Sequence, residues 1–278
     1  MTLNYIINKI FGKIEYILYR RRVSPLSTFY LNFRTLPISQ AIKFPIWVYG
    51  RVEFASLNGR IILKCNEIKS GMIKLGRHRD DYTLLSKRQF IRIDTDSSIT
   101  FNGYTSIASD FLLRVTGKGN LEFGEKVWIG QGVRFDCTDN IFIGQGSSIT
   151  YHTIISDSNH HYMIDEKNII TRMSAPIKIG AYNWIGNNSV ISKGCKTSAY
   201  TIVTHGSLLN KDYPAIDNSR KPMVLAGEPA KIIGYNKKRV FESKNEKVIK
   251  QFFENHPNEK TLFWNTEWSD DVELKYFL

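Results

Sequence analysis

The chain has 278 residues, of which 42% are hydrophobic and 13% aromatic, and its formal net charge at pH 7 is +12. This length allows one elongated domain with appendages, or two domains. No run of apolar residues is long enough for a transmembrane helix, and the N-terminus lacks the pattern of a signal peptide. The three cysteines, Cys65, Cys137 and Cys195, are odd in number and far apart, which argues against a disulfide framework and a CxxC metal site. We therefore expect a cytoplasmic protein that needs no metal.

The positive charge is concentrated toward the N-terminus. Residues 1–80 hold 14 Lys or Arg and 4 Asp or Glu, a net charge of +10, so the other 198 residues contribute only +2. This distribution favours an anionic partner, such as lipid headgroups, a pyrophosphate-linked substrate or the phosphates of a coenzyme. No helix-turn-helix pattern or basic-aromatic recognition motif accompanies the charge, so we do not expect nucleic acid.

Residues 1–40 are interpreted as an amphipathic helix followed by a linker. Between residues 5 and 19, apolar side chains recur at helical spacing: Ile7, Ile10, Phe11, Ile14, Ile17 and Leu18. Three arginines follow at residues 20–22, where cations suit the C-terminal end of a helix. We favour packing of this helix on its own protein. The alternative is peripheral membrane contact through residues 5–22, with the helix lying in the plane of the inner membrane face.

Residues 41–120 are expected to form irregular β coils or a cap, and not an independent domain. Short β-branched segments, such as residues 46–49 and 90–93, are bounded by Gly, Asp or Asn. Glycines are frequent enough for turns, but no regular spacing of the apolar residues is evident.

Residues 121–233 contain a six-residue repeat. The apolar or β-branched positions are Phe123, Ile129, Phe135, Ile143, Ile149, Ile155, Ile179, Ile185, Ile191, Thr197, Val203 and Leu209. The step is six within each block, except for a step of eight between Phe135 and Ile143. A short side chain follows four places later, as in Ser147, Ser189 and Cys195. Neither helices nor simple strands repeat at six, so this period predicts short strands that turn a corner every six residues and stack as coils. Glycines that follow the apolar residues, such as Gly144 and Gly186, are expected to allow the backbone angles of a tight corner.

These motifs resemble those of the hexapeptide-repeat acyltransferases, and in particular the O-acetyltransferases that modify sugars. The most specific strings are PIKIGAYNWIG at residues 176–186 and AGEPAK at residues 226–231. The resemblance implies a left-handed parallel β-helix. We therefore expect a mainly β protein with an N-terminal helix and strand extension, and the Lys-rich segment at about residues 242–255 predicts a partly helical C-terminal tail at residues 234–278. It also implies a homotrimer with active sites between subunits, and acetyl-CoA as the acyl donor.

A loop at residues 156–176 interrupts the repeat and begins with SDSNHHYMID. Long loops on rigid scaffolds are commonly functional, and histidine suits general base catalysis near neutral pH. The loop resembles the family's Ser-Asp-x-x-x-His signature, which implies His161 as the catalytic base, with His160 as the candidate one position earlier. Asp157 and Asp165 are the candidates for orienting the base.

The resemblance also implies a coenzyme groove along the coils. Its predicted wall comprises Trp184, Gly186, Ser189, Thr204 and Gly206, and Lys211 and Lys231 are candidates for binding the coenzyme phosphates. The corresponding function is transfer of acetyl from acetyl-CoA to a sugar hydroxyl of a bacterial surface polysaccharide or of its precursor, which is lipid-linked in one version of this hypothesis. Alternatives are N-acetylation of an amino sugar or serine, a zinc hydratase on the same scaffold, and a non-catalytic trimeric scaffold at a membrane surface.

Overall fold

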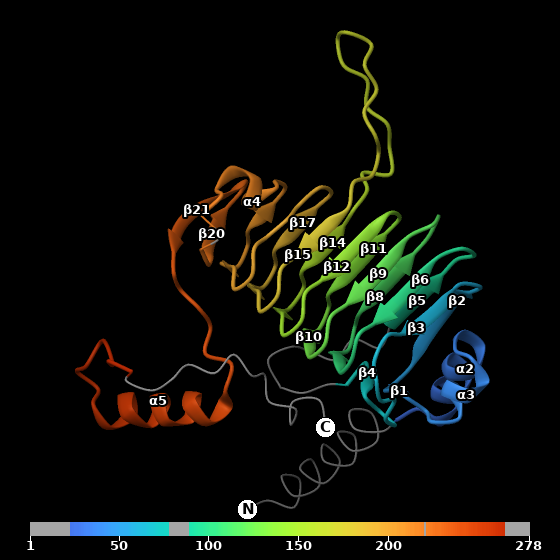
Figure 1. The fold of residues 1–278 in the computed structure, drawn as a ribbon, viewed down its shortest axis with the longest axis horizontal. Helices are drawn as coiled ribbons and strands as arrows, with labels where there is room; N and C mark the ends of the chain where they lie inside the picture. The colour runs from blue at the N-terminus through green and yellow to red at the C-terminus, as the bar shows by residue number, and fades with distance from the viewer. Residues whose placement is uncertain (1–22, 78–88, 220, 265–278) are drawn as a thin grey trace, which may run out of the picture.

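The computed structural model describes residues 23–77, 89–219 and 221–264, so the predicted helix within residues 5–19 lies outside the described residues. The described chain winds into a parallel β-helix, in which three short strands form one triangular coil and each strand pairs with its equivalent in the next coil (Figure 1). The coils stack in chain order from the blue end, near α2 and α3, to the orange end near α4.

Three sheets form the sides of this triangle. The first sheet contains β1 (Ile46–Val48), β4 (Ile73–Leu75), β7 (Thr105–Ile107), β10 (Val127–Ile129), β13 (Ser148–Ile149), β16 (Trp184–Ile185), β18 (Ile202–Val203), β20 (Met223–Gly227) and β21 (Ala230–Tyr235). The second sheet contains β2 (Val52–Leu57), β5 (Gln89–Ile93), β8 (Leu112–Val115), β11 (Arg134–Cys137), β14 (Ile154–Ser156), β17 (Val190–Ser192) and β19 (Leu208–Leu209). The third sheet contains β3 (Arg60–Leu63), β6 (Ser98–Phe101), β9 (Asn120–Phe123), β12 (Asn140–Ile143) and β15 (Ile177–Ile179). The pairs within these sheets are parallel except β20 with β21, which are antiparallel and lie at the last edge of the first sheet.

The repeat positions build the core in register. In the first sheet, one ladder of side chains runs from coil to coil through Leu75, Ile107, Ile129, Ile149, Ile185, Val203 and Leu225. Each of these side chains is at most 2% exposed. The strands before residue 121 pair in the same sheets as those after it, so the coils begin at β1 and extend well upstream of the regular repeat.

The corners explain the short and glycine positions. Ser189 and Ser207 are buried, and their hydroxyls donate to the carbonyl oxygens three residues earlier, at 2.8 and 2.9 Å. Glycine serves a different purpose from the one expected. A Cβ on Gly144 would lie 2.5 Å from the backbone nitrogen of Ala181 in the next coil, so glycine is required by close approach. The positive φ angle falls two residues later, at Gly146.

Four helices are assigned among the described residues: α2 (Pro25–Thr35), α3 (Ile38–Ala41), α4 (Tyr213–Ile216) and α5 (Ser243–Asn255). Helix α2 caps the first coil. Its Asn32 amide donates to the carbonyl of Ile46 at 2.7 Å, and its Thr28 hydroxyl accepts from the Val48 amide at 3.0 Å. These bonds satisfy backbone groups of β1 that would otherwise form an open sheet edge. Beyond β21 the chain runs back along the coils, and Phe241 packs against Tyr104, Trp128 and Tyr182 before α5 begins.

Candidate active site

The predicted loop leaves the β-helix between β14 and β15 and projects far from the coils (Figure 1, yellow). Its two sides meet in antiparallel bridges between Ser158 and Ser174 and between Ile164 and Ile170. The tip exposes large apolar side chains, among them Tyr162, at 69%, and Ile164, at 61%. A solvated tip is normally polar, so these side chains are unusual for a loop of an isolated subunit.

Asp157 anchors the base of the loop. Its side chain is fully buried, and its carboxylate accepts hydrogen bonds from the Thr138 amide at 2.8 Å, the Thr138 hydroxyl at 3.0 Å and the Asp139 amide at 2.9 Å. These bonds use both carboxylate oxygens and tie the loop to the corner between β11 and β12. Asp157 therefore holds the backbone, and no hydrogen bond joins it to either histidine.

His160 contacts a carboxylate that the sequence analysis did not identify. Its Nε2 lies 2.7 Å from Oδ2 of Asp136, and the other oxygen of Asp136 accepts a hydrogen bond from Nη1 of Arg114 at 2.6 Å. Asp136 and Arg114 are neighbours in register on β11 and β8, with both side chains on the outer face of the second sheet. The His160 side chain remains 38% exposed. A carboxylate and an imidazole thus meet at the foot of the loop, open to a ligand.

The other predicted polar residues of the loop have different surroundings. Among the described residues, His161 has no hydrogen-bond partner, and its side chain is exposed. Asp165 accepts from the amides of Lys167 and Ile169, both at 2.9 Å, and so stabilises the turn at the tip. Among the described residues, no histidine forms a hydrogen bond with its carboxylate.

The predicted coenzyme wall lies on the later coils. The Trp184 side chain is 38% exposed, and the guanidinium of Arg239 lies 5.3 Å from its ring centroid. Ser189 is wholly buried in its corner, so its side chain cannot reach a ligand. The hydroxyl of Thr204 lies 3.0 Å from that of Ser207.

Two further groups on these coils have contrasting accessibility. A Cβ on Gly186 would lie 2.5 Å from the amide nitrogen of His205, whereas one on Gly206 would meet nothing within 4 Å. The backbone near Gly206 is therefore open to a ligand, while Gly186 is needed for coil stacking. Lys211 and Lys231 are both exposed on the last coils.

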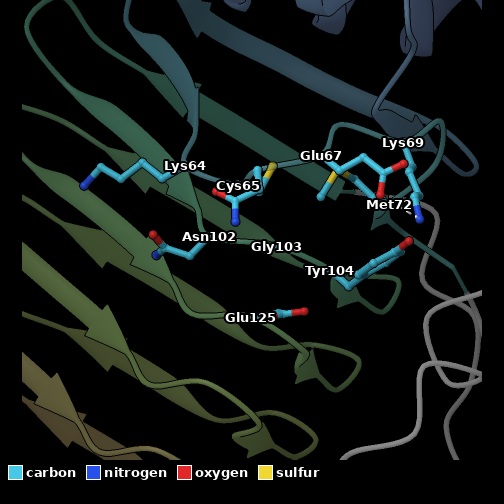
Figure 2. Close-up of a pocket in the computed structure, with 10 residues that line it drawn as sticks. Lys64, Cys65, Glu67, Lys69, Met72, Asn102, Gly103, Tyr104 and Glu125 are labelled. Atoms are coloured by element: carbon cyan, nitrogen blue, oxygen red, sulfur yellow. Dashed lines mark ion pairs between the residues drawn. The ribbon is translucent and has the colours of Figure 1, made fainter.

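A separate cavity of about 310 Å³ lies at the corner between the third and first sheets of the early coils (Figure 2). Lys64, Lys69, Glu67, Glu125 and Tyr104 contribute to its lining, and the Lys69 ammonium pairs with Glu67 at 3.0 Å. None of the predicted site residues lines it. Among the described residues, no cluster of three or more His, Cys, Asp or Glu side chains could hold a metal ion. No helix within the described part of the chain is long and apolar enough to span a membrane.

Comparison with known proteins supports the architecture. No family model matches the chain. The WbbJ protein of Escherichia coli K12, which carries the name of a lipopolysaccharide biosynthesis O-acetyl transferase, is 27% identical over 150 residues, covering 51% of this chain and 74% of WbbJ. The crystal structure of the polySia-specific acetyltransferase NeuO is similar with a TM-score of 0.53 and 20% identity, covering 80% of this chain and 91% of NeuO. The structure of AntD, an N-acyltransferase from Bacillus cereus, matches with 12% identity and a TM-score of 0.40, and the match covers 77% of this chain and 89% of AntD.

The coils and the likeness to NeuO define a left-handed parallel β-helix, as the sequence predicts. With the similarity to WbbJ, the predicted resemblance to the hexapeptide-repeat sugar acetyltransferases is confirmed.

Proposed function

We propose that the protein is an acetyl-CoA-dependent O-acetyltransferase, with a sugar hydroxyl of a bacterial surface polysaccharide, or of its precursor, as acceptor. WbbJ is named for O-acetyl transfer in lipopolysaccharide biosynthesis, and NeuO is named for acetyl transfer specific to polySia. Both names support this choice of acceptor. The observation that carries the proposal is the Asp136–His160 pair at the foot of the loop that interrupts the repeat.

His160 is our candidate for the general base, one residue before the histidine that the motif nominates first. If Nε2 donates to the Asp136 carboxylate, the lone pair resides on Nδ1 of His160, which can accept the proton of the acceptor hydroxyl. The hydroxyl oxygen attacks the thioester carbonyl as it loses that proton. A C–O bond forms, the C–S bond breaks, and the proton passes from His160 to the departing thiolate. The neighbouring carboxylate stabilises the imidazolium that exists between these two transfers.

The donor is expected along the later coils. The backbone near Gly206 leaves space for pantetheine, although the Gly206 amide itself donates to the carbonyl of Asn187 at 2.8 Å. The exposed Lys211 and Lys231 can pair with phosphates. Trp184 offers an exposed aromatic face beside Arg239. These residues fit an extended, anionic thioester, whereas Ser189 contributes to the corner alone because it is buried.

The assembly that we propose is a homotrimer with active sites between subunits. On the outer face of the second sheet, Ile154, Val190 and Leu208 follow one another in register from coil to coil, and Ile154 is 43% exposed. This apolar row lies on the same sheet as Asp136, and the loop with the apolar tip begins at its edge. A neighbouring subunit would cover both features and enclose His160. A cytoplasmic location at the inner membrane face fits an acceptor that is lipid-linked.

The test is acetyl-CoA consumption with a panel of oligosaccharides, comparing wild type with His160→Gln and His161→Gln. We expect His160→Gln to lower kcat by about 10²–10⁴-fold, which is the usual contribution of a general base. His161→Gln is the matched control and should retain most activity. Loss of activity in His161→Gln alone would move the base to that residue. Full turnover in both variants, or failure of the wild type to bind CoA in calorimetry, would contradict the transferase proposal.

A further inference from the structure

Helix α2 has its polar and apolar faces reversed relative to an ordinary surface helix. The face packed on the β-helix holds Thr28, Asn32 and Thr35, which are at most 6% exposed, together with Leu31. Thr28 and Asn32 are buried because they satisfy the open edge of β1, and the Thr35 hydroxyl donates to the Leu31 carbonyl at 2.6 Å. Apart from Leu31 and the partly buried Phe33, the large apolar residues of α2 are left exposed.

Exposed apolar side chains lie on α2 and on the following α3 at the same end of the coil stack, and we call this set the end-cap patch. Its members and their exposed fractions are Leu26 (84%), Phe29 (55%), Tyr30 (49%), Ile38 (73%) and Ile42 (60%). Phe29 stacks on Phe33 with ring centroids 4.5 Å apart, so the aromatic part of the patch is held in place. Several large apolar side chains exposed at one end of a fold are typical of an interaction site.

The segment of the chain that forms the end-cap patch and the first coil is cationic. Within residues 23–60 the charged side chains are Arg34, Lys43, Arg51 and Arg60, against the single carboxylate of Glu53. Arg34 and Lys43 lie on or directly after the helices of the patch, and both are exposed. A second copy of this surface would bring like charges together, whereas an anionic surface is attracted to it.

The position of the patch also points to a flat partner. Helices α2 and α3 lie at the first end of the coil stack, opposite α4, β20 and β21 (Figure 1). Their outer face therefore points away from the coils and leaves the sides of the β-helix free. In the trimer proposed above, three such patches would face the same way and bind together, which multiplies weak contacts. The joint binding of three patches rests on the proposed trimer, whereas binding by a single patch does not.

We propose that the end-cap patch is a docking surface for an anionic lipid bilayer. The apolar side chains of α2 and α3 enter the headgroup–acyl boundary, and Arg34 and Lys43 lie among the anionic headgroups. This site is distinct from the contact through residues 5–22 that the sequence suggests, and it differs from an ordinary in-plane helix because the polar face is bound to the protein instead of to water.

The test is co-sedimentation of the full-length protein with phosphatidylcholine vesicles that do or do not contain phosphatidylglycerol. The double variant Ile38→Asp/Ile42→Asp should lower the partition coefficient on phosphatidylglycerol vesicles by at least about tenfold. Each isoleucine side chain moves from water into the bilayer when the wild type binds, and the variant loses this gain in free energy. Lys43→Glu should weaken binding less, with a smaller salt dependence than wild type. Leu26→Asp provides an independent variant on α2.

The matched controls are Ile216→Asp and Ile233→Asp, which change exposed isoleucines near the opposite end of the stack. They should bind as wild type, and thermal unfolding should show that all variants are folded. Equal binding by wild type and the Ile38→Asp/Ile42→Asp variant would overturn the proposal, because residues 5–22 would then account for the binding. Absence of wild-type binding to anionic vesicles would also overturn the proposal. So would a lower oligomeric mass in the double variant, because it would identify the patch as an interface between copies. None of these measurements depends on acetyl transfer.

Discussion

At the scale of single residues, Asp136 occupies the central position of the candidate site. Its carboxylate accepts from Arg114 at 2.6 Å and lies 2.7 Å from Nε2 of His160, so one side chain connects a strand of the preceding coil to the loop. Arg92 continues the same row on β5, but its guanidinium pairs with Asp94 at 3.0 Å. The row therefore offers Arg114, which contacts the candidate site, and Arg92 as a matched control.

We predict that Asp136→Asn lowers kcat by about 10²-fold with little change in KM, since it removes the charge that supports the imidazolium. Arg114→Gln should have a smaller effect of about tenfold, because the carboxylate loses its orientation but not its charge. Steady-state kinetics separate the two variants by the size of the loss in kcat. Arg92→Gln should leave kcat unchanged, and an equal loss in this control would indicate a general structural effect.

The three cysteines differ in accessibility. Burial raises the pKa of the Cys195 thiol to about 12, and burial, with the nearby Asp157 carboxylate, raises the pKa of the Cys137 thiol far above its ordinary value. Cys65 is partly exposed, and burial followed by the charge of Glu125 also raises its pKa. Since the thiolate is the reactive form, all three should react slowly.

We predict that a thiol reagent at mildly alkaline pH modifies Cys65 alone in the folded protein, and all three cysteines after denaturation. Mass spectrometry of digested protein identifies the modified residue, with Cys65→Ser as the control that should show no modification when folded. Rapid modification of Cys195 in the native protein would mean that the corner positions open readily.

At the scale of elements, a strand stabilises the core through the side chains that point inward, and its outward side chains contribute little. In β14, Ile155 is fully buried in the ladder of the second sheet, whereas the adjacent Ile154 is 43% exposed on the outer face. Both residues are isoleucines on the same strand, so a comparison of their variants isolates the effect of burial on stability.

We predict that Ile155→Ala lowers the free energy of unfolding by about 3–4 kcal/mol, because it removes buried methyl groups and leaves a cavity. Ile154→Ala should change it by less than about 1 kcal/mol in dilute, unassociated protein. Chemical denaturation monitored by circular dichroism measures both. Similar losses for the two variants would show that the inward and outward sides of β14 are misassigned.

At the scale of the whole molecule, the described residues expose apolar side chains in two places besides the end-cap patch: the row of Ile154, Val190 and Leu208 on the second sheet, and the loop tip with Tyr162 and Ile164. An isolated β-helix would leave both in water. Association side by side would bury them together and place His160 in a cleft between chains, which connects oligomerisation to activity.

We predict that Ile154→Asp dissociates the assembly and lowers turnover, because a carboxylate would be buried without a partner in the interface. Analytical ultracentrifugation should show a trimeric mass for wild type and a smaller mass for the variant. Ile62→Asp, on the outer face of the third sheet at 37% exposure, is the control and should remain trimeric. A monomeric wild type with full activity would contradict the proposed assembly.

Much of the fold could be predicted from the chain. The inward ladder, including Ile149, Ile185 and Val203, follows from the period of six, and the interruption after Ile155 marks the loop. The early coils could not be predicted as regular, since the corner between β3 and β4 holds a longer insertion that hides the period. The role of Asp136 was equally hidden, because it depends on which outward side chains become neighbours across coils.

The amino-acid sequence by itself determines the β-helix, because each inward side chain packs against its equivalent one coil away and the repeat therefore records the contact directly. Only the tertiary structure decides which histidine meets a carboxylate, since His160 and Asp136 are 24 residues apart and the loop that carries His160 bends back to the preceding coil. The same holds for α2, whose buried polar face results from the open edge of β1 that it covers. Periodic packing can be read along a chain, whereas contacts between outward side chains depend on how the coils are stacked.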